Sequence, residues 1–387
     1  MNHLPRILSV VLLLWATWAW PAHAQGPEPP EMAARSWLLL DAGAGQTLAG
    51  HDIDSPVEPA SLTKLMTAYL VFDALRAGKI TLEQTFGVSE RAWRMPGSRM
   101  FIEPRMRVPV EDLIKGMIVQ SGNDATVALA EGVAGSVERF VDLMNQQAQA
   151  LGMTATRYRN PEGLSEPGHQ TTARDLALLA RRLLQDFPQY VGYYAIKRYR
   201  YPGTPAANDS NRNLLLWRDP GVDGLKTGFT DAAGYCLIAT ARREHPGVGT
   251  RRLIAVVLGA ASESARANEA QKLLNWGFTA WEPVRLFEPG VPVASPPVWK
   301  GRSATVGIGS PQPVVVAVPT GAAQRLTTRL VRPEPLVAPL GQGQRLGTLE
   351  VLLDGHPLTA VPLQVLEPVA EAGLFGRAWD AIRLWIR

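Results

Sequence analysis

Between residues 36 and 282, the spacing of apolar positions changes twice along the chain. Short runs rich in apolar and β-branched residues predict buried strands, whereas apolar positions repeated every three or four residues predict helices. The predicted strands are Ser36–Asp41, Gln46–Ala49, Val222–Thr230, Tyr235–Ala241 and Arg252–Leu258. The predicted helices are Leu62–Ala77, Val110–Ile118, Ala125–Gly132, Val137–Leu151, Ala173–Gln185 and Ser264–Phe278. Strands at both ends with helices between them favour an α+β domain whose strands meet in one antiparallel sheet.

The pattern changes after Pro283, where prolines become dense and the apolar runs become short. Of the 31 prolines in the chain, 14 lie between Pro283 and Pro368, beside short runs such as Val314–Val318 and Leu346–Leu353. Proline at this density interrupts long helices, and short apolar runs bounded by turn residues indicate strands. We therefore expect a small all-β domain over residues 283–368, and no catalytic constellation is visible in it.

The N-terminal segment has the pattern of a secretory signal peptide. Arg6 precedes the apolar run Ile7–Trp20, and Ala22-His23-Ala24 follows it. A basic start, a short apolar core and two small residues before a cleavage point are typical of such peptides, and the run is short for a bilayer crossing. Residues 1–24 are therefore expected to be cleaved off, with an uncleaved anchor as the alternative. Residues 25–35 are expected to form a linker.

The last 19 residues, 369–387, predict an amphipathic helix that begins near Leu374. At ~100° per residue, apolar and charged side chains fall on opposite sides of such a helix. The apolar side carries Leu374, Phe375, Ala378, Trp379, Ile382, Trp385 and Ile386, and the charged side carries Arg377, Asp380, Arg383 and Arg387. We expect this helix to lie on a membrane surface. The alternative is a helix that docks on its own domain.

Composition and charge exclude several classes of function for this chain of 387 residues. Its 39 Lys and Arg residues against 35 Asp and Glu residues give a net charge of +4 without any basic run, so a nucleic-acid partner is not expected. The single cysteine, Cys236, excludes an intrachain disulfide and a cysteine-based metal site. With only six histidines, we expect neither a bound metal nor another cofactor.

The first motif that carries chemistry is Ser61 followed by Lys64, in the run Pro59-Ala60-Ser61-Leu62-Thr63-Lys64-Leu65-Met66-Thr67. Residues three apart at the start of a helix point to one face. A serine hydroxyl is a weak nucleophile until a base takes its proton, and a desolvated lysine can do this. By itself the pair is common, because a capped helix with a solvated lysine has the same pattern.

Two further motifs follow, about 60 and about 105 residues apart. Ser121-Gly122-Asn123 lies at a predicted helix junction, where Ser121 can relay a proton between Lys64 and a leaving amine, and Asn123 can bind a peptide group. Lys226-Thr227-Gly228 lies on a predicted strand, where Gly228 lets a substrate backbone approach and pair with the strand. A turn and a surface strand are the ordinary explanations for these two motifs. The order of all three motifs makes the case for catalysis.

The triplet resembles that of serine acyl-transferases of the β-lactamase and penicillin-binding group. It is most similar to the low-molecular-weight penicillin-binding proteins of the D-alanyl-D-alanine carboxypeptidase family. The resemblance extends over Ser36 to Trp281 and includes the runs Pro59–Thr67, Gln120–Ala125, Thr172–Ala177 and Leu273–Phe278. It implies a β-lactamase-like catalytic domain, an antiparallel sheet flanked by helices, over residues 36–282. It also implies a following β-rich domain and a C-terminal helix on the periplasmic face of the bacterial inner membrane.

The resemblance also implies the reaction and its residues. The substrate is the peptidoglycan stem peptide ending in D-Ala-D-Ala, and β-lactams acylate the same serine. The catalytic residues are Ser61 as nucleophile, Lys64 as general base and Ser121; the substrate-binding residues are Asn123, Lys226, Thr227, Gly228, Phe229 and Arg266. The backbone N–H groups of Ser61 and Phe229 form the oxyanion hole, and Arg266 receives the terminal carboxylate. Arg212 is the second choice for the carboxylate, and a surface arginine is the alternative for Arg266.

Three residues outside the motifs and three other functions are alternatives to this hypothesis. Glu162 is interpreted as a turn residue, His169 has no partner at a telling spacing, and Cys236 is expected to pack in the core. A β-lactamase is disfavoured by the second domain, the terminal helix and the sequence Ser-Gly-Asn. An endopeptidase shares the same motifs. A non-catalytic cell-wall binding protein is disfavoured by the intact motif residues.

Overall fold

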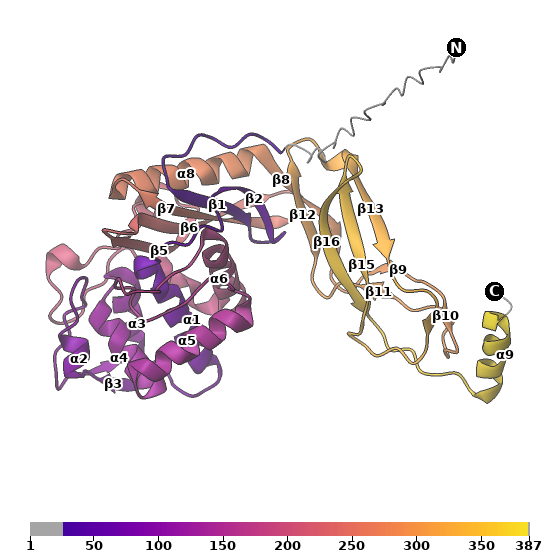
Figure 1. The fold of residues 1–387 in the computed structure, drawn as a ribbon, viewed down its shortest axis with the longest axis horizontal. Helices are drawn as coiled ribbons and strands as arrows, with labels where there is room; N and C mark the ends of the chain where they lie inside the picture. The colour runs from indigo at the N-terminus through magenta and orange to yellow at the C-terminus, as the bar shows by residue number, and fades with distance from the viewer. Residues whose placement is uncertain (1–25, 386–387) are drawn as a thin grey trace, which may run out of the picture.

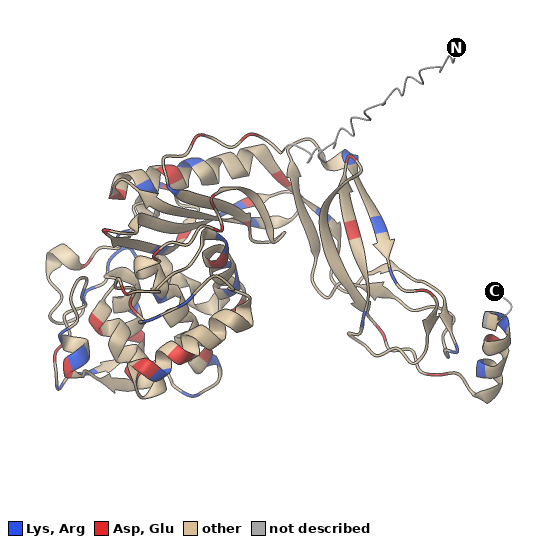
Figure 2. Ribbon diagram, viewed as in Figure 1, with Lys and Arg blue, Asp and Glu red and all other residues tan. Residues whose placement is uncertain are grey.

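A computed structural model describes residues 26–385, which form two lobes that follow one another along the long axis of the molecule (Figure 1). The predicted signal peptide, residues 1–24, lies outside the described residues, as do Ile386 and Arg387 of the predicted terminal helix. Acidic and basic residues are intermixed along the helices of the first lobe (Figure 2).

The first lobe is built on a five-stranded antiparallel sheet in the order β2-β1-β7-β6-β5. Its strands are β1 (Ser36–Asp41), β2 (Gln46–His51), β5 (Val222–Thr230), β6 (Gly234–His245) and β7 (Gly249–Ala260). Strand β1 pairs with β7, so the early and late strands meet in one sheet as the sequence indicated. Strand β5 forms an edge of the sheet, where a strand can pair with another extended segment.

Helices cover both faces of this sheet (Figure 1). Helix α8 (Glu263–Ala280) covers one face, and the other face is covered by α1 (Lys64–Arg76), α3 (Val110–Val119), α4 (Asn123–Ala134), α5 (Val137–Leu151) and α6 (Ala173–Asp186). Leu38 packs in the core on the multi-helix side, and Leu39 packs in the core beneath α8. Successive side chains of a strand point to opposite faces, so a strand buried on both sides requires an unbroken apolar run.

Short elements connect these helices and strands, and most of them were not predicted. They are η1 (Ala60–Thr63), β3 (Thr85–Gly87), α2 (Glu90–Trp93), β4 (Arg107–Pro109), η2 (Pro188–Ala195), η3 (Ala206–Asn208) and α7 (Leu215–Arg218). Elements this short leave little periodic signal in the sequence. The predicted helix at Leu62 is divided, because Ser61 lies in the 3₁₀ turn η1 and α1 begins at Lys64.

The second lobe is an all-β domain with its own apolar core, which confirms the predicted fold class. Its elements are β8 (Trp281–Phe287), β9 (Pro292–Ala294), β10 (Val298–Trp299), β11 (Ile308–Gly309), β12 (Val314–Pro319), η4 (Ala323–Arg325), β13 (Leu326–Val331), β14 (Leu336–Val337), β15 (Arg345–Leu353) and β16 (His356–Val365). Helix α9 (Leu374–Trp385) follows at the far end of this lobe (Figure 1).

The lobes are joined through hydrogen bonds from the first lobe to β8 and β12. Arg251 on β7 contacts Asp41 at 2.9 Å and donates a hydrogen bond to the carbonyl of Trp281 at 2.6 Å. Gln46 on β2 accepts a hydrogen bond from the backbone of Ala317 on β12. The segment before β1, predicted as a linker, lies along α8, where Lys272 donates to the carbonyl of Glu31. The hydrogen bonds of Arg251 and Gln46 fix β8 and β12 against the sheet of the first lobe.

Candidate active site

The three sequence motifs converge on one cleft of about 420 Å³ in the first lobe. Turn η1 and the junction of α3 and α4 supply one wall, and β5 with the start of α8 supplies the other. Its lining comprises Ser61, Gly97, Ser98, Arg99, Phe101, Ser121, Asn123, Glu162, Gly163, Leu164, Asn208, Arg212, Thr227, Gly228, Phe229, Thr230, Tyr235, Glu263 and Arg266. Segments far apart in sequence therefore form a single site.

Lys64 lies beneath Ser61 and is buried. Its Nζ donates hydrogen bonds to Ser61 Oγ at 3.0 Å, to Asn123 Oδ1 at 2.7 Å and to the carbonyl of Glu162 at 2.6 Å. Burial lowers the pKa of Lys64 from 10.5 to about 7, opposed by the charge of Glu162 and assisted by that of Arg212. A neutral amine keeps two protons for the shorter contacts to Asn123 and Glu162. Its lone pair then faces the Ser61 hydroxyl, which is the arrangement of a general base.

Ser121 and Lys226 form a second hydrogen-bonded pair across the cleft. Lys226 Nζ donates to Ser121 Oγ at 2.9 Å and to the carbonyl of Thr227 at 2.9 Å. Burial lowers the pKa of Lys226, as do the nearby cations Lys64, Arg212 and Arg266. The hydroxyl of Ser121 thus contacts Lys226, whereas Asn123 makes the contact to Lys64. Ser121 has a φ of +59°, a left-handed conformation that turns the chain sharply between α3 and α4.

Gly228 brings strand β5 against the turn that carries Ser61. A Cβ atom on Gly228 would lie 3.1 Å from Ala60 Cβ and 3.2 Å from Ser61 N, so a side chain there would press on η1. Phe229 follows on the same strand, half exposed, with its ring centroid 4.3 Å from that of Tyr235. The close packing brings the backbone of β5 beside that of Ser61, where two N–H groups can serve one oxyanion.

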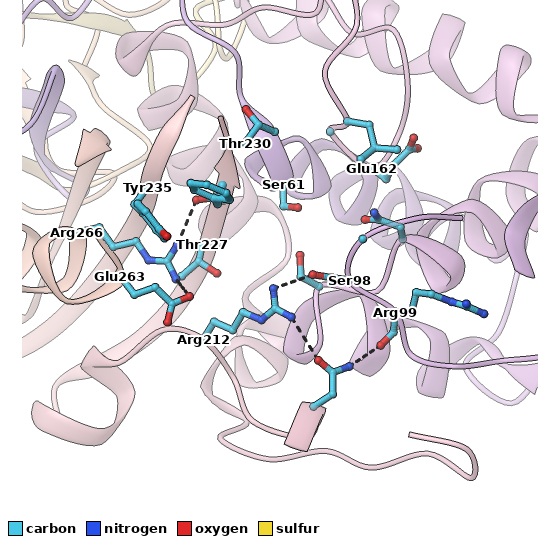
Figure 3. Close-up of a pocket in the computed structure, with 18 of the residues that line it drawn as sticks. Ser61, Ser98, Arg99, Glu162, Arg212, Thr227, Thr230, Tyr235, Glu263 and Arg266 are labelled. Atoms are coloured by element: carbon cyan, nitrogen blue, oxygen red, sulfur yellow. Dashed lines mark hydrogen bonds and ion pairs between the residues drawn. The ribbon is translucent and has the colours of Figure 1, made fainter. Parts of the chain in front are cut away.

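Arg212 and Arg266 lie on one side of Ser61, and Glu162 and Arg99 lie on the other side (Figure 3). Arg266 on α8 is buried and donates a hydrogen bond to the carbonyl of Gly228 at 3.2 Å, which excludes the alternative of a surface arginine. Arg212 donates to Ser98 Oγ at 2.7 Å. Two guanidinium groups beside the edge strand are suited to bind a carboxylate.

The loop that contains Glu162 supports the nucleophile turn from below. Gly163 has a φ of +92°, and a Cβ atom there would lie only 1.9 Å from the carbonyl oxygen of Ala60. His169 Nδ1 accepts a hydrogen bond from the backbone of Arg159, so Nε2 carries the proton and donates to Thr63 Oγ1 at 2.8 Å. Burial lowers the pKa of His169 to about 4 and keeps the ring neutral. The loop is therefore locked against η1.

The structure brings all nine predicted site residues together, and it adds others that sequence reasoning missed. The predicted ones are Ser61, Lys64, Ser121, Asn123, Lys226, Thr227, Gly228, Phe229 and Arg266. Glu162 does lie in a bend, but it is buried at the cleft instead of being a plain surface turn residue. Ser98, Arg99 and Asn208 come from segments without a recognisable motif. Cys236 packs in the core as predicted.

Residues 26–385 were predicted to hold no metal site, and the predicted membrane contact is peripheral. Within that range, no three or more His, Cys, Asp or Glu side chains gather in a group suited to a metal ion. Nor does that part of the chain contain a helix with the length and apolar character needed to cross a bilayer.

Comparisons with known proteins agree with this arrangement. The sequence matches the family described as D-alanyl-D-alanine carboxypeptidase over residues 23–262, and the C-terminal domain of penicillin-binding protein 5 over residues 281–371. The D-alanyl-D-alanine carboxypeptidase DacC of Escherichia coli (strain K12) is 42% identical, over 97% of this chain and 94% of that protein. DacA of the same strain is 38% identical over 92% of this chain and 89% of that protein.

A solved structure shares the architecture of both lobes. Penicillin-binding protein 5 from Haemophilus influenzae superimposes with a TM-score of 0.83 and 36% identity, covering 89% of this chain and 100% of that one. The matches extend through both lobes, and the motif-bearing cleft lies within the first of them. The chain therefore belongs to the D-alanyl-D-alanine carboxypeptidase family of serine peptidases.

Proposed function

We propose that this protein removes the terminal D-Ala from peptidoglycan stem peptides through an acyl-enzyme on Ser61. The observation that carries the proposal is the contact of 3.0 Å between Ser61 Oγ and the buried Lys64 Nζ. The pKa of Lys64, lowered to about 7, lets the free amine exist near neutral pH. A buried free amine beside a hydroxyl is what serine attack requires when no histidine serves as base.

In the first step, Ser61 Oγ attacks the carbonyl carbon of the penultimate D-Ala, and Lys64 takes the hydroxyl proton. The backbone N–H groups of Ser61 and Phe229 stabilise the oxyanion of the tetrahedral intermediate. The C–N bond then breaks as the Ser121 hydroxyl passes its proton to the departing amine of D-Ala and receives one from Lys226, which contacts it at 2.9 Å. Water subsequently hydrolyses the ester on Ser61, and the extra proton of Lys64 returns through solvent to Lys226, which restores the enzyme.

The cleft accounts for a preference for a free C-terminus. A peptide that pairs antiparallel with β5 places its C-terminal end near Thr227 and its earlier residues toward Thr230. Arg266 and Arg212 lie on that side of Ser61, where they pair with the terminal carboxylate (Figure 3). Thr227 supplies a hydroxyl to the same group. A β-lactam carries a carboxylate beside a reactive amide, so the same residues direct its acylation of Ser61.

The decisive experiment measures D-Ala released from a synthetic acyl-D-Ala-D-Ala peptide, with and without penicillin. The wild-type protein is expected to release D-Ala, and stoichiometric labelling by penicillin is expected to abolish the release. A Ser61→Ala variant is expected to lose both activities by more than about 10⁴-fold. Release of D-Ala by Ser61→Ala at the wild-type rate would refute the site, and loss of bound penicillin within seconds would indicate a β-lactamase.

We also propose an exported, peripheral enzyme in which residues 36–282 form the catalytic unit and residues 283–368 a β-rich spacer. Helix α9 would lie on the periplasmic face of the inner membrane. In support, α9 exposes Leu374, Phe375, Trp379, Ile382 and Trp385. On its polar side, Asp380 accepts a hydrogen bond from the backbone of Lys300, and Arg383 lies 5.7 Å from the ring of Trp299. An apolar face directed away from the protein suits insertion between lipid headgroups.

A further inference from the structure

Glu162 is a buried acidic group at the cleft for which the reaction above has no use. Its side chain is 5% exposed, and among residues 26–385 its Oε2 atom has no hydrogen-bond partner. Glu263, the other acidic residue of the lining, is largely exposed and pairs with Arg266. A buried carboxylate without a partner is costly, whereas a protonated carboxyl is much less so.

The main chain at Glu162 is held rigidly against the nucleophile turn. Gly163 packs on the Ala60 carbonyl, and its own N–H donates to Asn160 Oδ1 at 2.7 Å. Asn160 Nδ2 in turn donates to the carbonyl of Leu164 at 3.0 Å. The carbonyl of Glu162 is therefore fixed at 2.6 Å from Lys64 Nζ. Its side chain is consequently held in the same buried surroundings as the proposed base.

Few charged groups surround this pair. Arg91 on α2 and the exposed Glu166 on the same loop act on Glu162. Asp124 on α4 and Arg212, between η3 and α7, act on Lys64, and Lys226 on β5 lies near Lys64. Asp124 is itself occupied, since it accepts hydrogen bonds from the backbone of residues 100–102. Arg91 is engaged at the surface with Glu138. Asp124 and Arg91 thus have partners of their own, whereas Glu162 Oε2 has none among residues 26–385.

Burial and attraction act on the pair in opposite directions. Burial raises the pKa of Glu162 and lowers that of Lys64, so it disfavours the charge of both groups. Their mutual attraction favours the carboxylate together with the ammonium. An ionised Glu162 therefore holds the proton on Lys64, and a protonated Glu162 releases Lys64 as a free amine at lower pH.

We propose that Glu162 is a positioning residue whose protonation state sets the pH at which Lys64 can activate Ser61. The proposal rests on the role of Lys64 given above. During attack, the Ser61 proton moves to Lys64 Nζ as the bond from Oγ to the acyl carbon forms, and the side chain of Glu162 exchanges no proton. Glu162 acts only through its charge, which raises the pH at which Lys64 becomes a free amine.

The test is the pH profile of acylation by a fluorescent penicillin, measured for the wild type and for Glu162→Gln. Glutamine keeps the shape and cannot ionise, so it removes the attraction that holds the proton on Lys64. The acid limb of the profile is expected to move to lower pH by about one unit. Glu166→Gln, which removes an exposed carboxylate from the same loop, is the matched control and should move the limb far less, because Glu166 is in water and acts on Glu162 only through its charge. A Glu162→Gln profile that superimposes on the wild type, or an equal shift in Glu166→Gln, would overturn the proposal.

A second measurement needs no active variant. In wild-type protein labelled with ¹³C at the glutamate carboxyl, one resonance is expected to titrate well above the ordinary pKa of 4.5. That resonance should be missing in Glu162→Gln, and its presence there would assign the shift to another residue and refute the proposal. If Ser61 were not the nucleophile, penicillin labelling would fail at every pH. Failure of the present inference would instead leave labelling intact with an unchanged pH profile.

Discussion

The cleft buries side chains that are usually exposed, and helix α9 exposes side chains that are usually buried. In the cleft, Lys64 is 1% exposed and Lys226 and Arg266 are each 3% exposed. On α9, Phe375 is 94% exposed and Trp385 is 89% exposed. Globular proteins ordinarily keep charge in water and large apolar groups in the core. Both regions therefore give up stability, and both are where we place the activities of the protein.

The difference between the two regions lies in how each arrangement is tolerated. The cleft supplies its own compensation, because Lys64 and Lys226 donate hydrogen bonds to protein oxygens and their lowered pKa values reduce the charge they carry. The apolar face of α9 receives no comparable compensation from the described residues of the β domain, whose contacts to the helix involve its polar side. A buried charge can thus be completed within the fold, whereas an exposed apolar face requires an outside surface.

The largest effect is expected from removing the base. Lys64→Gln should lower the rate of acylation by penicillin by about 10⁴-fold, because no other group within residues 26–385 is hydrogen-bonded to Ser61 Oγ as a base would be. The midpoint of thermal unfolding should not fall in parallel, since the variant loses a desolvated amine. Stopped-flow labelling and calorimetry measure the two quantities. Acylation at the wild-type rate would show that another residue takes the proton.

The next effect concerns the exposed face of α9. Trp379→Ser combined with Trp385→Ser should weaken binding to vesicles of phosphatidylethanolamine and phosphatidylglycerol by about 10²-fold or more, because each large apolar side chain contributes ~1.5–3 kcal/mol on burial. Release of D-Ala from a soluble peptide should be unchanged. Trp217→Ser, at a tryptophan on α7 that is also exposed, is the control. Equal vesicle binding by all three proteins would contradict the membrane role.

A smaller effect is expected at the carboxylate-binding side of the cleft. Arg266→Gln should lower kcat/KM for an acyl-D-Ala-D-Ala peptide by about 10- to 100-fold, because a charge-assisted hydrogen bond contributes ~1.5–3 kcal/mol. A substrate whose terminal carboxylate is amidated should lose far less. Arg218→Gln, an exposed arginine bonded to Asn268, controls for the change in net charge. A similar loss on both substrates would remove Arg266 from carboxylate recognition.

The smallest effect is expected at Phe229. Its proposed contribution to the oxyanion hole is a backbone N–H, and its side chain is half exposed against Tyr235. Phe229→His should therefore change the acylation rate by no more than about twofold. Steady-state hydrolysis of the peptide checks this directly. A loss above tenfold would mean that the ring itself positions the substrate.

The parts of the fold that could be predicted from the sequence are those with long, regular patterns. Strand β5 and helix α5 begin and end where predicted, and the buried alternation of Leu38 and Leu39 explains why β1 reads as one apolar run. The spacing of Ser61 and Lys64 correctly placed both groups on one face. Their helix nevertheless begins with a 3₁₀ turn, because Ala60 adopts a φ of +47° just before the nucleophile.

The rest depends on contacts between distant segments. Ser121 was expected to serve Lys64, yet its hydroxyl contacts Lys226, because the register of β5 against the α3–α4 junction decides which lysine it meets. Glu162 was interpreted as a turn residue and does lie in a bend, but its contact with Lys64 is made by a main-chain carbonyl. A carbonyl is present in every residue, so sequence carries no signal for it. Asn208 lies in a segment whose elements are too short to show a period, and Arg212 in the same segment could be named only as the second choice for the carboxylate.

The tight approach of Gly163 to Ala60 also bears on how such an enzyme can diversify. Position 163 accepts no side chain, so Gly163 fixes the backbone of the loop against Ala60 whatever side chain stands at position 162. Residue 162 presents its side chain to the cleft, and its main-chain carbonyl accepts a hydrogen bond from Lys64. That hydrogen bond does not depend on the side chain at position 162. On the proposal above, a substitution at position 162 changes the pH range in which the enzyme is acylated. It leaves the hydrogen bond between Lys64 and the carbonyl of residue 162 in place. Of these two adjacent residues, Gly163 cannot be replaced without moving the backbone, whereas the side chain of Glu162 can be exchanged.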